Sequence, residues 1–128
     1  MNTAQTMQLI ISLTSPYARK ARIMASENHI TIEVKVDVPW NEDTGVIAFN
    51  PLGKVPILIR ENGQPLFDSR VICEYLDMLG TARLIPDSPS DRIAVKQWEA
   101  LADGIMDAAL MSDHIICGTD AQANCRSR

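Results

Sequence analysis

The residues of this 128-residue chain best suited to specific chemistry lie around a Val-Pro pair, Val55-Pro56. The apolar run Ile57-Leu58-Ile59 follows directly, and proline is tolerated at the first position of a strand because it needs no donor for the ladder. We expect the Val55–Pro56 peptide bond to be cis, a form taken by about 5–6% of X-Pro bonds in folded proteins. This geometry would turn the Val55 backbone outward, so that a peptide-like ligand could pair with it as an added strand. The pattern therefore predicts a binding site made of backbone atoms.

A second candidate site is the pair Asp68-Ser69, which opens a helical pattern that runs to Leu79. A helix N-terminus favours an anion such as a carboxylate, and Asp68 can accept a hydrogen bond from an ammonium group. The pair would thus recognise a zwitterion by its two charges. The alternative is a capping pair that binds no ligand.

A third candidate is Ser15, which precedes Pro16 at the start of another predicted helix. Its hydroxyl could donate a hydrogen bond to a sulfur atom, and the helix N-terminus adds free N–H groups and the positive end of a dipole. Thr14 is the rival hydroxyl, and a simple N-cap is the alternative role for Ser15. Arg19 and Lys20 are expected to be solvated on an exposed helix face.

Three motifs in this order resemble the N-terminal domain of the glutathione S-transferases: Ser15-Pro16-Tyr17-Ala18-Arg19-Lys20, Asn50-Pro51-Leu52-Gly53-Lys54-Val55-Pro56 and Phe67-Asp68-Ser69. The resemblance runs from about Gln8 to Gly80. It implies a thioredoxin-like domain that binds glutathione, with Asp68 and Ser69 on the glutamyl end and the cis Val55–Pro56 bond presenting the Val55 backbone.

The same resemblance implies that Ser15 activates the glutathione thiol for transfer to an electrophilic small molecule. It also implies that Lys54 reaches the glycyl carboxylate, although a solvated surface lysine is the alternative. A non-catalytic binding or regulatory protein with this fold is the alternative function. A glutathione-dependent reductase is disfavoured because such enzymes usually have cysteine where Ser15 stands.

Composition narrows the class of protein. The net charge of −4 and a pI near 5.0 give no reason to expect nucleic acid or a membrane surface as partner. Apolar residues make up 46% of the chain, which suits a globular core, and no run reaches membrane-spanning length. The three cysteines form no C-x-x-C pair, and no metal-binding pattern is present, so we expect reduced thiols, no metal and a cytoplasmic protein without a secretory signal.

Hydrophobic periodicity predicts the elements that must position the three candidate sites. They are a strand over Leu9–Leu13, a helix from Ser15 to Asn28-His29, a half-buried strand over Thr31–Val38, an irregular segment anchored by Trp40 and Phe49, a hairpin of Val55–Arg60 and Pro65–Phe67, and a helix over Ser69–Leu79. The order βαβ-ββα predicts an α/β fold, a mixed four-stranded sheet with thioredoxin topology.

We expect residues 1–80 to form this domain, 81–90 a linker and 91–128 part of an all-helical C-terminal domain. A helix over Asp91–Met111 carries an apolar stripe that includes Trp98, Leu101 and Ile105, and the pattern fades after about Ser112. Since members of the family have further helices here, the resemblance implies a truncated domain with weak turnover. The apolar stripe is then expected to pack in a homodimer.

Overall fold

The structure is a computed structural model that describes residues 5–119, with side chains up to Asp113. The described residues fall into two compact units, one ending at Ile85 and the other beginning at Pro86. The elements are β1 (Gln8–Ile11), α1 (Pro16–Glu27), β2 (Glu33–Val36), α2 (Val46–Phe49), β3 (Ile57–Ile59), β4 (Pro65–Leu66), α3 (Ser69–Leu79) and α4 (Pro89–Thr119).

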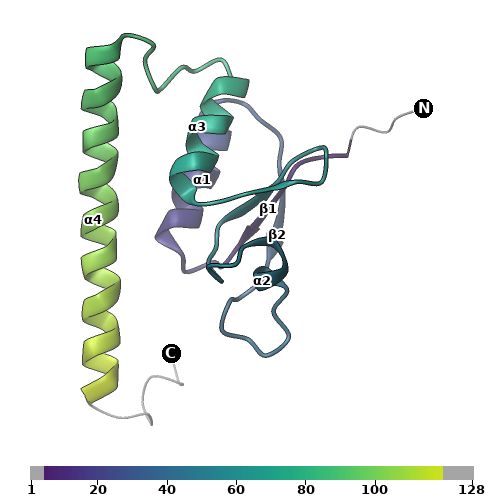
Figure 1. Ribbon diagram of the computed structural model, residues 1–128, viewed down its shortest axis with the longest axis vertical. Coiled ribbons are helices and arrows are strands. Elements are labelled where there is room, and N and C mark those ends of the chain that lie inside the picture. Colours follow the sequence, from purple (N-terminus) through teal and green to yellow (C-terminus); the bar gives the residue numbers. More distant parts are fainter. Residues whose placement is uncertain (1–4, 120–128) are drawn as a thin grey trace. The chain divides into compact units, whose positions relative to one another are not determined.

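The first unit is built on a four-stranded mixed sheet with the order β2-β1-β3-β4 (Figure 1). β1 pairs with β2 in parallel and with β3 antiparallel, and β3 pairs antiparallel with β4. The hairpin between β3 and β4 turns at Gly63, whose φ of 79° favours glycine. The predicted βαβ-ββα order and thioredoxin topology are confirmed.

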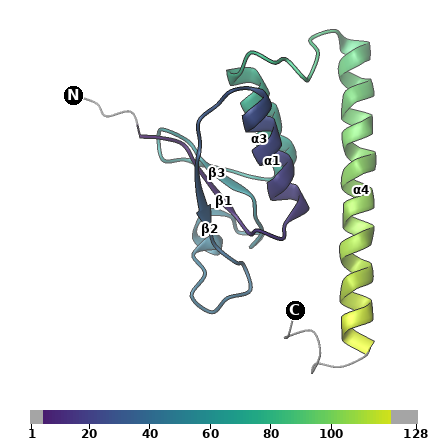
Figure 2. The same ribbon diagram turned by 180° about the vertical axis from the view of Figure 1, so that it is seen from behind.

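The two faces of the sheet bury separate apolar clusters because side chains alternate along each strand. On one face Leu9, Ile11 and Leu58 pack with α1 and α3, which lie side by side in both views (Figures 1 and 2). On the other face Ile10 and Ile57 pack with Val46 of α2. Helices therefore cover both faces of the sheet, with α1 and α3 on one face and α2 on the other.

Small residues set the packing of α1. Its buried positions are Ala18, Ala21 and Ala25, spaced three and four residues apart along one face. Tyr17 and Met24 are only half-buried. The prediction that the helix ends at Asn28 is confirmed, since Asn28 is its C-cap.

Two predictions about the peripheral segments are wrong. β2 is shorter than Thr31–Val38, and all four of its residues are exposed, because it is an edge strand bonded only to β1. Trp40 and Phe49 do not anchor the segment before β3, since they are 74% and 37% exposed. The fully buried Val46 anchors this segment instead.

The end of α3 is held by a buried polar network that hydrophobic periodicity does not reveal. Asp77, 3% exposed, accepts hydrogen bonds from the backbone N–H groups of Leu84 at 2.8 Å and Ile85 at 2.9 Å. Asn28 donates to Asp77 at 3.4 Å and accepts from the Ala82 N–H at 3.1 Å. The chain after α3 is therefore fastened to the first unit as far as Ile85.

The apolar side chains of α3 are not buried equally. Ile72 and Leu76 are buried, but Val71 and Leu79 are 46% and 52% exposed. Cys73 also takes a core position, and it forms no disulfide among the described residues.

The second unit consists of α4, which extends beyond the predicted Asp91–Met111 at both ends. Within this unit Trp98, Leu101 and Ile105 are 72%, 53% and 62% exposed, so Trp98 is not a core residue. The side chains of His114 and Cys117 and all of Cys125 lie outside the described residues. Across residues 5–119 there is no helix long and apolar enough to cross a membrane.

Candidate functional site

The strand register brings the three candidate sites to one edge of the sheet. Ile10 of β1 lies opposite Ile57 of β3, and Leu58 of β3 lies opposite Leu66 of β4. The C-terminal ends of β1 and β4 therefore lie beside the N-terminal end of β3. Ser15 follows β1, Val55-Pro56 precedes β3, and Asp68-Ser69 follows β4.

The spacing of the strands sets the width of this edge. Neighbouring strands lie about 4.8 Å apart, so β1 and β4, with β3 between them, are separated by about 10 Å. Both α1 and α3 begin at this edge, and each presents the positive end of its helix dipole there. The arrangement suits an extended ligand that carries negative charge.

The Val55–Pro56 peptide bond is cis, as predicted. Val55 is half-buried, and neither its N–H nor its C=O has a hydrogen-bond partner within residues 5–119. Since backbone groups are normally paired, Val55 offers one donor and one acceptor to a ligand.

A buried asparagine that we did not anticipate holds this loop in place. Asn50 is 1% exposed, and its side chain donates to the Lys54 C=O at 3.0 Å and accepts from the Leu52 N–H at 2.9 Å. The Asn50 C=O also accepts from the Gly53 N–H at 2.9 Å. The sequence signal was the Asn-Pro-Leu-Gly turn, because asparagine commonly bonds the backbone two residues onward.

Lys54 lies next to Val55 and is exposed. Its ammonium group forms no ion pair within the described part of the chain. It is thus available to a carboxylate near the Val55 backbone.

Ser15 is the N-cap of α1, and its Oγ accepts a hydrogen bond from the Ala18 N–H at 3.1 Å. A serine hydroxyl has one O–H donor in addition to its acceptor lone pairs. The capping bond uses an acceptor site, and no described residue accepts the Ser15 proton. Ser15 can therefore cap the helix and donate to a ligand at the same time, whereas Thr14 is exposed in the turn before it.

Asp68 is the N-cap of α3, and its carboxylate accepts from the Arg70 backbone N–H at 3.1 Å and from Arg70 Nη2 at 2.9 Å. Burial acts to raise the pKa of Asp68, but the hydrogen bonds and charge of Arg70 outweigh it, so the pKa lies below its usual value. Asp68 is therefore ionised at neutral pH and keeps lone pairs for a ligand cation. The Phe67–Asp68 peptide bond is also cis, which the sequence did not indicate.

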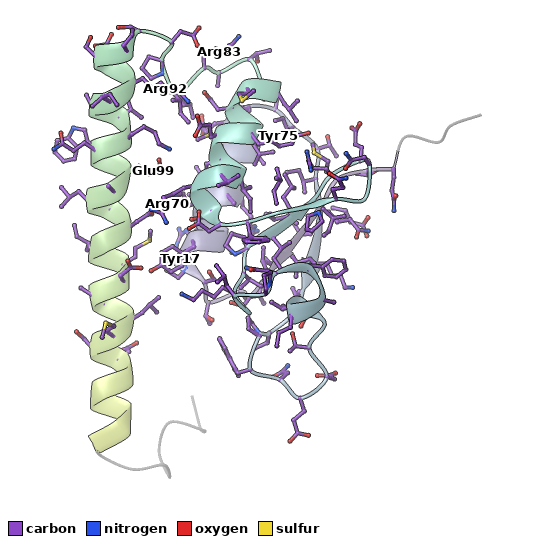
Figure 3. The ribbon with its side chains drawn as sticks, viewed as in Figure 1. Tyr17, Arg70, Tyr75, Arg83, Arg92 and Glu99 are labelled. Carbon is purple, nitrogen blue, oxygen red and sulfur yellow. The ribbon has the colours of Figure 1, made fainter. Side chains whose placement is uncertain are left out.

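Ser69 lies at the first turn of α3 and is only 4% exposed. Its hydroxyl has no hydrogen-bond partner among the described residues. No side-chain polar atom of the described residues is both fully buried and unpaired, so the Ser69 hydroxyl is reachable and is a further donor at the sheet edge. Figure 3 shows the neighbouring Arg70 on α3 and Tyr17 on α1.

A hollow of about 510 Å³ adjoins Ser15 along α1, and its lining includes Ser12, Arg19 and Arg22. We expected Arg19 only to be solvated on an exposed helix face. Its place in the lining of the hollow depends on the shape of the surface, which residue spacing does not reveal. Val55, Asp68 and Ser69 do not line it, so it shares only Ser15 with the candidate site. Among the described side chains there is no group of three His, Cys, Asp or Glu placed to hold a metal.

Comparison with known proteins agrees with this geometry. The family model for the glutathione S-transferase N-terminal domain matches residues 14–79. The uncharacterized GST-like protein YibF of Escherichia coli K12 is 48% identical over 107 residues, which are 83% of this chain and 53% of the relative. Glutathione S-transferase U28 of Arabidopsis thaliana is 32% identical over 92 residues, covering 70% of this chain and 41% of that protein. The chain thus spans about half the length of the curated relatives it matches.

Solved structures show the same likeness. A glutathione S-transferase from Methylobacillus flagellatus KT with GSH bound has a TM-score of 0.83 and 44% identity, over 91% of this chain and 57% of that one. A glutathione transferase family member from Pseudomonas fluorescens Pf-5 with bound glutathione has a TM-score of 0.77 and 35% identity, over 93% and 60%. Since the family model covers more than half of the sequence and all of the candidate site, this chain belongs to the glutathione S-transferase family.

Proposed function

We propose that this chain binds glutathione across the sheet edge, with the cysteinyl backbone paired to Val55. The observation that carries the proposal is the unpaired N–H and C=O of Val55 beside the cis bond. An extended tripeptide is about 10 Å long, which matches the roughly 10 Å from β1 to β4. The glutathione-bound structures with TM-scores of 0.83 and 0.77 support the same ligand.

The ends of glutathione are then recognised by charge. Asp68 accepts from the glutamyl ammonium group, and the hydroxyl and backbone N–H of Ser69 donate to its carboxylate. Lys54 meets the glycyl carboxylate. No metal or further cofactor is part of the proposal.

The sulfur lies near Ser15, whose free proton donates to the thiolate. A thiol has a pKa of about 8.5, and lowering it by about two units requires roughly 2.7 kcal/mol of preferential thiolate stabilisation. A charge-assisted hydrogen bond contributes about 1.5–3 kcal/mol and a helix N-terminus about 0.3–1 kcal/mol. Together they suffice, and the thiolate then attacks an electrophilic small molecule as a glutathione S-transferase.

Titration with glutathione by calorimetry, followed by an assay with a generic aryl halide, tests binding and transfer separately. Saturable binding with turnover supports a transferase. Binding without turnover supports the alternative, a non-catalytic binding or regulatory protein. Absence of binding at millimolar glutathione contradicts both. We also propose a cytoplasmic location, since the sequence has no C-x-x-C pair and reduced cysteines are typical of that compartment.

We also propose a homodimer in which α4 packs against its counterpart. Its exposed Trp98, Leu101 and Ile105 support this, since each large side chain left in water forgoes about 1.5–3 kcal/mol. Light scattering at micromolar concentration should show the dimer. A monomer would contradict it, and dissociation on changing Trp98→Ser would assign the interface to α4.

A further inference from the structure

The hollow beside Ser15 follows one stripe of α1. Ser15, Arg19, Arg22 and Ser26 all line it, and they are four, three and four positions apart. This spacing places them on one face of a helix. The buried alanines lie on a neighbouring face, about 100° around the helix, and Arg19, Arg22 and Ser26 are exposed, so the stripe points away from the core.

The two arginines of this stripe, Arg19 and Arg22, have no ion-pair partner among the residues that the structure describes. They are three residues apart, so their side chains are neighbours on the helix surface. Two adjacent guanidinium groups without a counter-ion form a site for a planar anion, which arginine binds through parallel hydrogen bonds.

The lining of the hollow also includes a hydroxyl group that can donate a hydrogen bond. Ser12 lines the hollow and is only 4% exposed. Its backbone C=O accepts from the Ser15 N–H at 3.3 Å, but its side chain has no hydrogen-bond partner within residues 5–119. Within the part of the chain that the structure describes, no side-chain polar atom is both fully buried and unpaired, so the Ser12 hydroxyl is reachable from the hollow and offers a donor to a group that enters it.

We propose that this hollow selects electrophiles that carry a carboxylate, which Arg19 and Arg22 bind while the reacting carbon lies at Ser15. This inference rests on the proposed transfer of glutathione and names its substrate class. At a rise of 1.5 Å per residue, the two arginines lie about 6 and 10 Å along the axis from Ser15. Side chains on a helix lean toward its N-terminus, so the guanidinium groups lie nearer to Ser15 than these axial distances, and the carboxylate is expected less than about 10 Å from the reacting carbon.

A chlorodinitrobenzoate is a suitable test substrate, and its uncharged amide is the matched comparison. The glutathione thiolate attacks the carbon that bears chlorine, the C–S bond forms, and chloride leaves with the electron pair of the C–Cl bond. No electron is gained or lost overall, and the carboxylate is unchanged. For binding alone, dinitrobenzoate and dinitrobenzamide without chlorine serve as unreactive probes.

The experiment measures affinity for the two unreactive probes by calorimetry, in the wild type and in Arg19→Gln, Arg22→Gln and Lys35→Gln. Lys35 lies exposed on β2 and controls for the loss of one positive charge. Affinity for glutathione is measured in the same proteins. Dinitrobenzoate should bind the wild type more tightly than the amide, and each arginine variant should lose about two- to fivefold, the value of one partly exposed ion pair. Lys35→Gln and all affinities for glutathione should stay unchanged.

Each outcome separates the two proposals. Equal affinity for the charged and uncharged probes, or no detectable binding of either, would overturn the carboxylate site whatever glutathione does. Weaker binding of glutathione itself in the arginine variants would also overturn the carboxylate site, because the arginines would then contact glutathione instead of the electrophile. A charge preference that depends on Arg19 and Arg22 in a protein that does not bind glutathione would support the hollow and reject the proposed function. Where turnover is measurable, the ratio of kcat/KM for the two chlorinated substrates should follow the same pattern.

Discussion

Replacing the buried Asn50 by alanine should separate the geometry of the Val55 loop from the residues that contact glutathione. In the wild type the Asn50 side chain bridges the Lys54 C=O and the Leu52 N–H, at 3.0 and 2.9 Å. Asn50→Ala removes both bonds and changes no group proposed to touch the ligand. The variant therefore tests whether the loop must be held for the Val55 backbone to pair.

The expected cost follows from the bonds that are lost. Each hydrogen bond contributes about 1 kcal/mol net, and water can replace the lost partners because Leu52 and Lys54 are exposed. We expect the free energy of unfolding to fall by about 2 kcal/mol, which lowers Tm by about 8–16 °C for a domain of this size. Affinity for glutathione should fall by about tenfold, equivalent to about 1.4 kcal/mol.

Asn62→Ala is the matched control. Asn62 forms the same kind of turn, with its Oδ1 accepting from the Gln64 N–H at 3.0 Å, but in the hairpin at the other end of β3. Calorimetric titration and thermal unfolding of both variants should show weaker glutathione binding for Asn50→Ala alone. Affinity within twofold of wild type in a folded Asn50→Ala protein would refute the reasoning.

Three further predictions concern single residues. Ser15→Ala should raise the pKa of the bound glutathione thiol, measured by thiolate absorbance, while affinity for glutathione stays within a few-fold. Thr14→Val should leave the pKa of this thiol unchanged, and the reverse result would assign the thiol contact to Thr14. The pKa of Asp68 is held below its usual value, so its stabilising contribution is present above the unfolded pKa and is lost as pH falls through the folded value. Wild type should therefore lose more stability than Asp68→Asn between about pH 5 and pH 2, and equal losses would contradict the Arg70 contact. A Cβ at Gly80 would overlap the Asn28 side chain, whereas one at Gly104 meets no atom within 4 Å. Gly80→Ala should thus lower Tm, and Gly104→Ala should raise the free energy of unfolding by about 0.5–1 kcal/mol. Unfolding curves that show Gly80→Ala to be as stable as Gly104→Ala would contradict the close packing of Gly80 against Asn28.

The fold could be predicted where local pattern decides the structure. Ser15-Pro16 marks the start of α1, Gly63 permits the hairpin turn, and the apolar period of α3 gives its bounds correctly. These are short-range effects of capping, turn geometry and amphipathicity. The cis Val55–Pro56 bond was also predicted, from its place before a strand and from the resemblance.

What the sequence did not reveal depends on contacts between distant segments. Asn28 and Asp77 pair across 49 positions, and a polar residue in a core position is invisible to hydrophobic periodicity. The exposure of Trp40 has the same origin, because Val46 fills the core position that the larger side chain was expected to take. Ser12, Arg19 and Arg22 come together only through the shape of the hollow.

Pairing of glutathione with the Val55 backbone is tested most directly by following backbone amide signals in nuclear magnetic resonance spectra during a glutathione titration. The Val55 amide should shift and saturate together with those of Ser15 and Ser69, because all three lie at the edge where β1, β3 and β4 meet. Asn62, at the opposite end of β3, should stay unchanged. A Val55 amide that does not move at millimolar glutathione, or shifts confined to another part of the molecule, would contradict the proposed site.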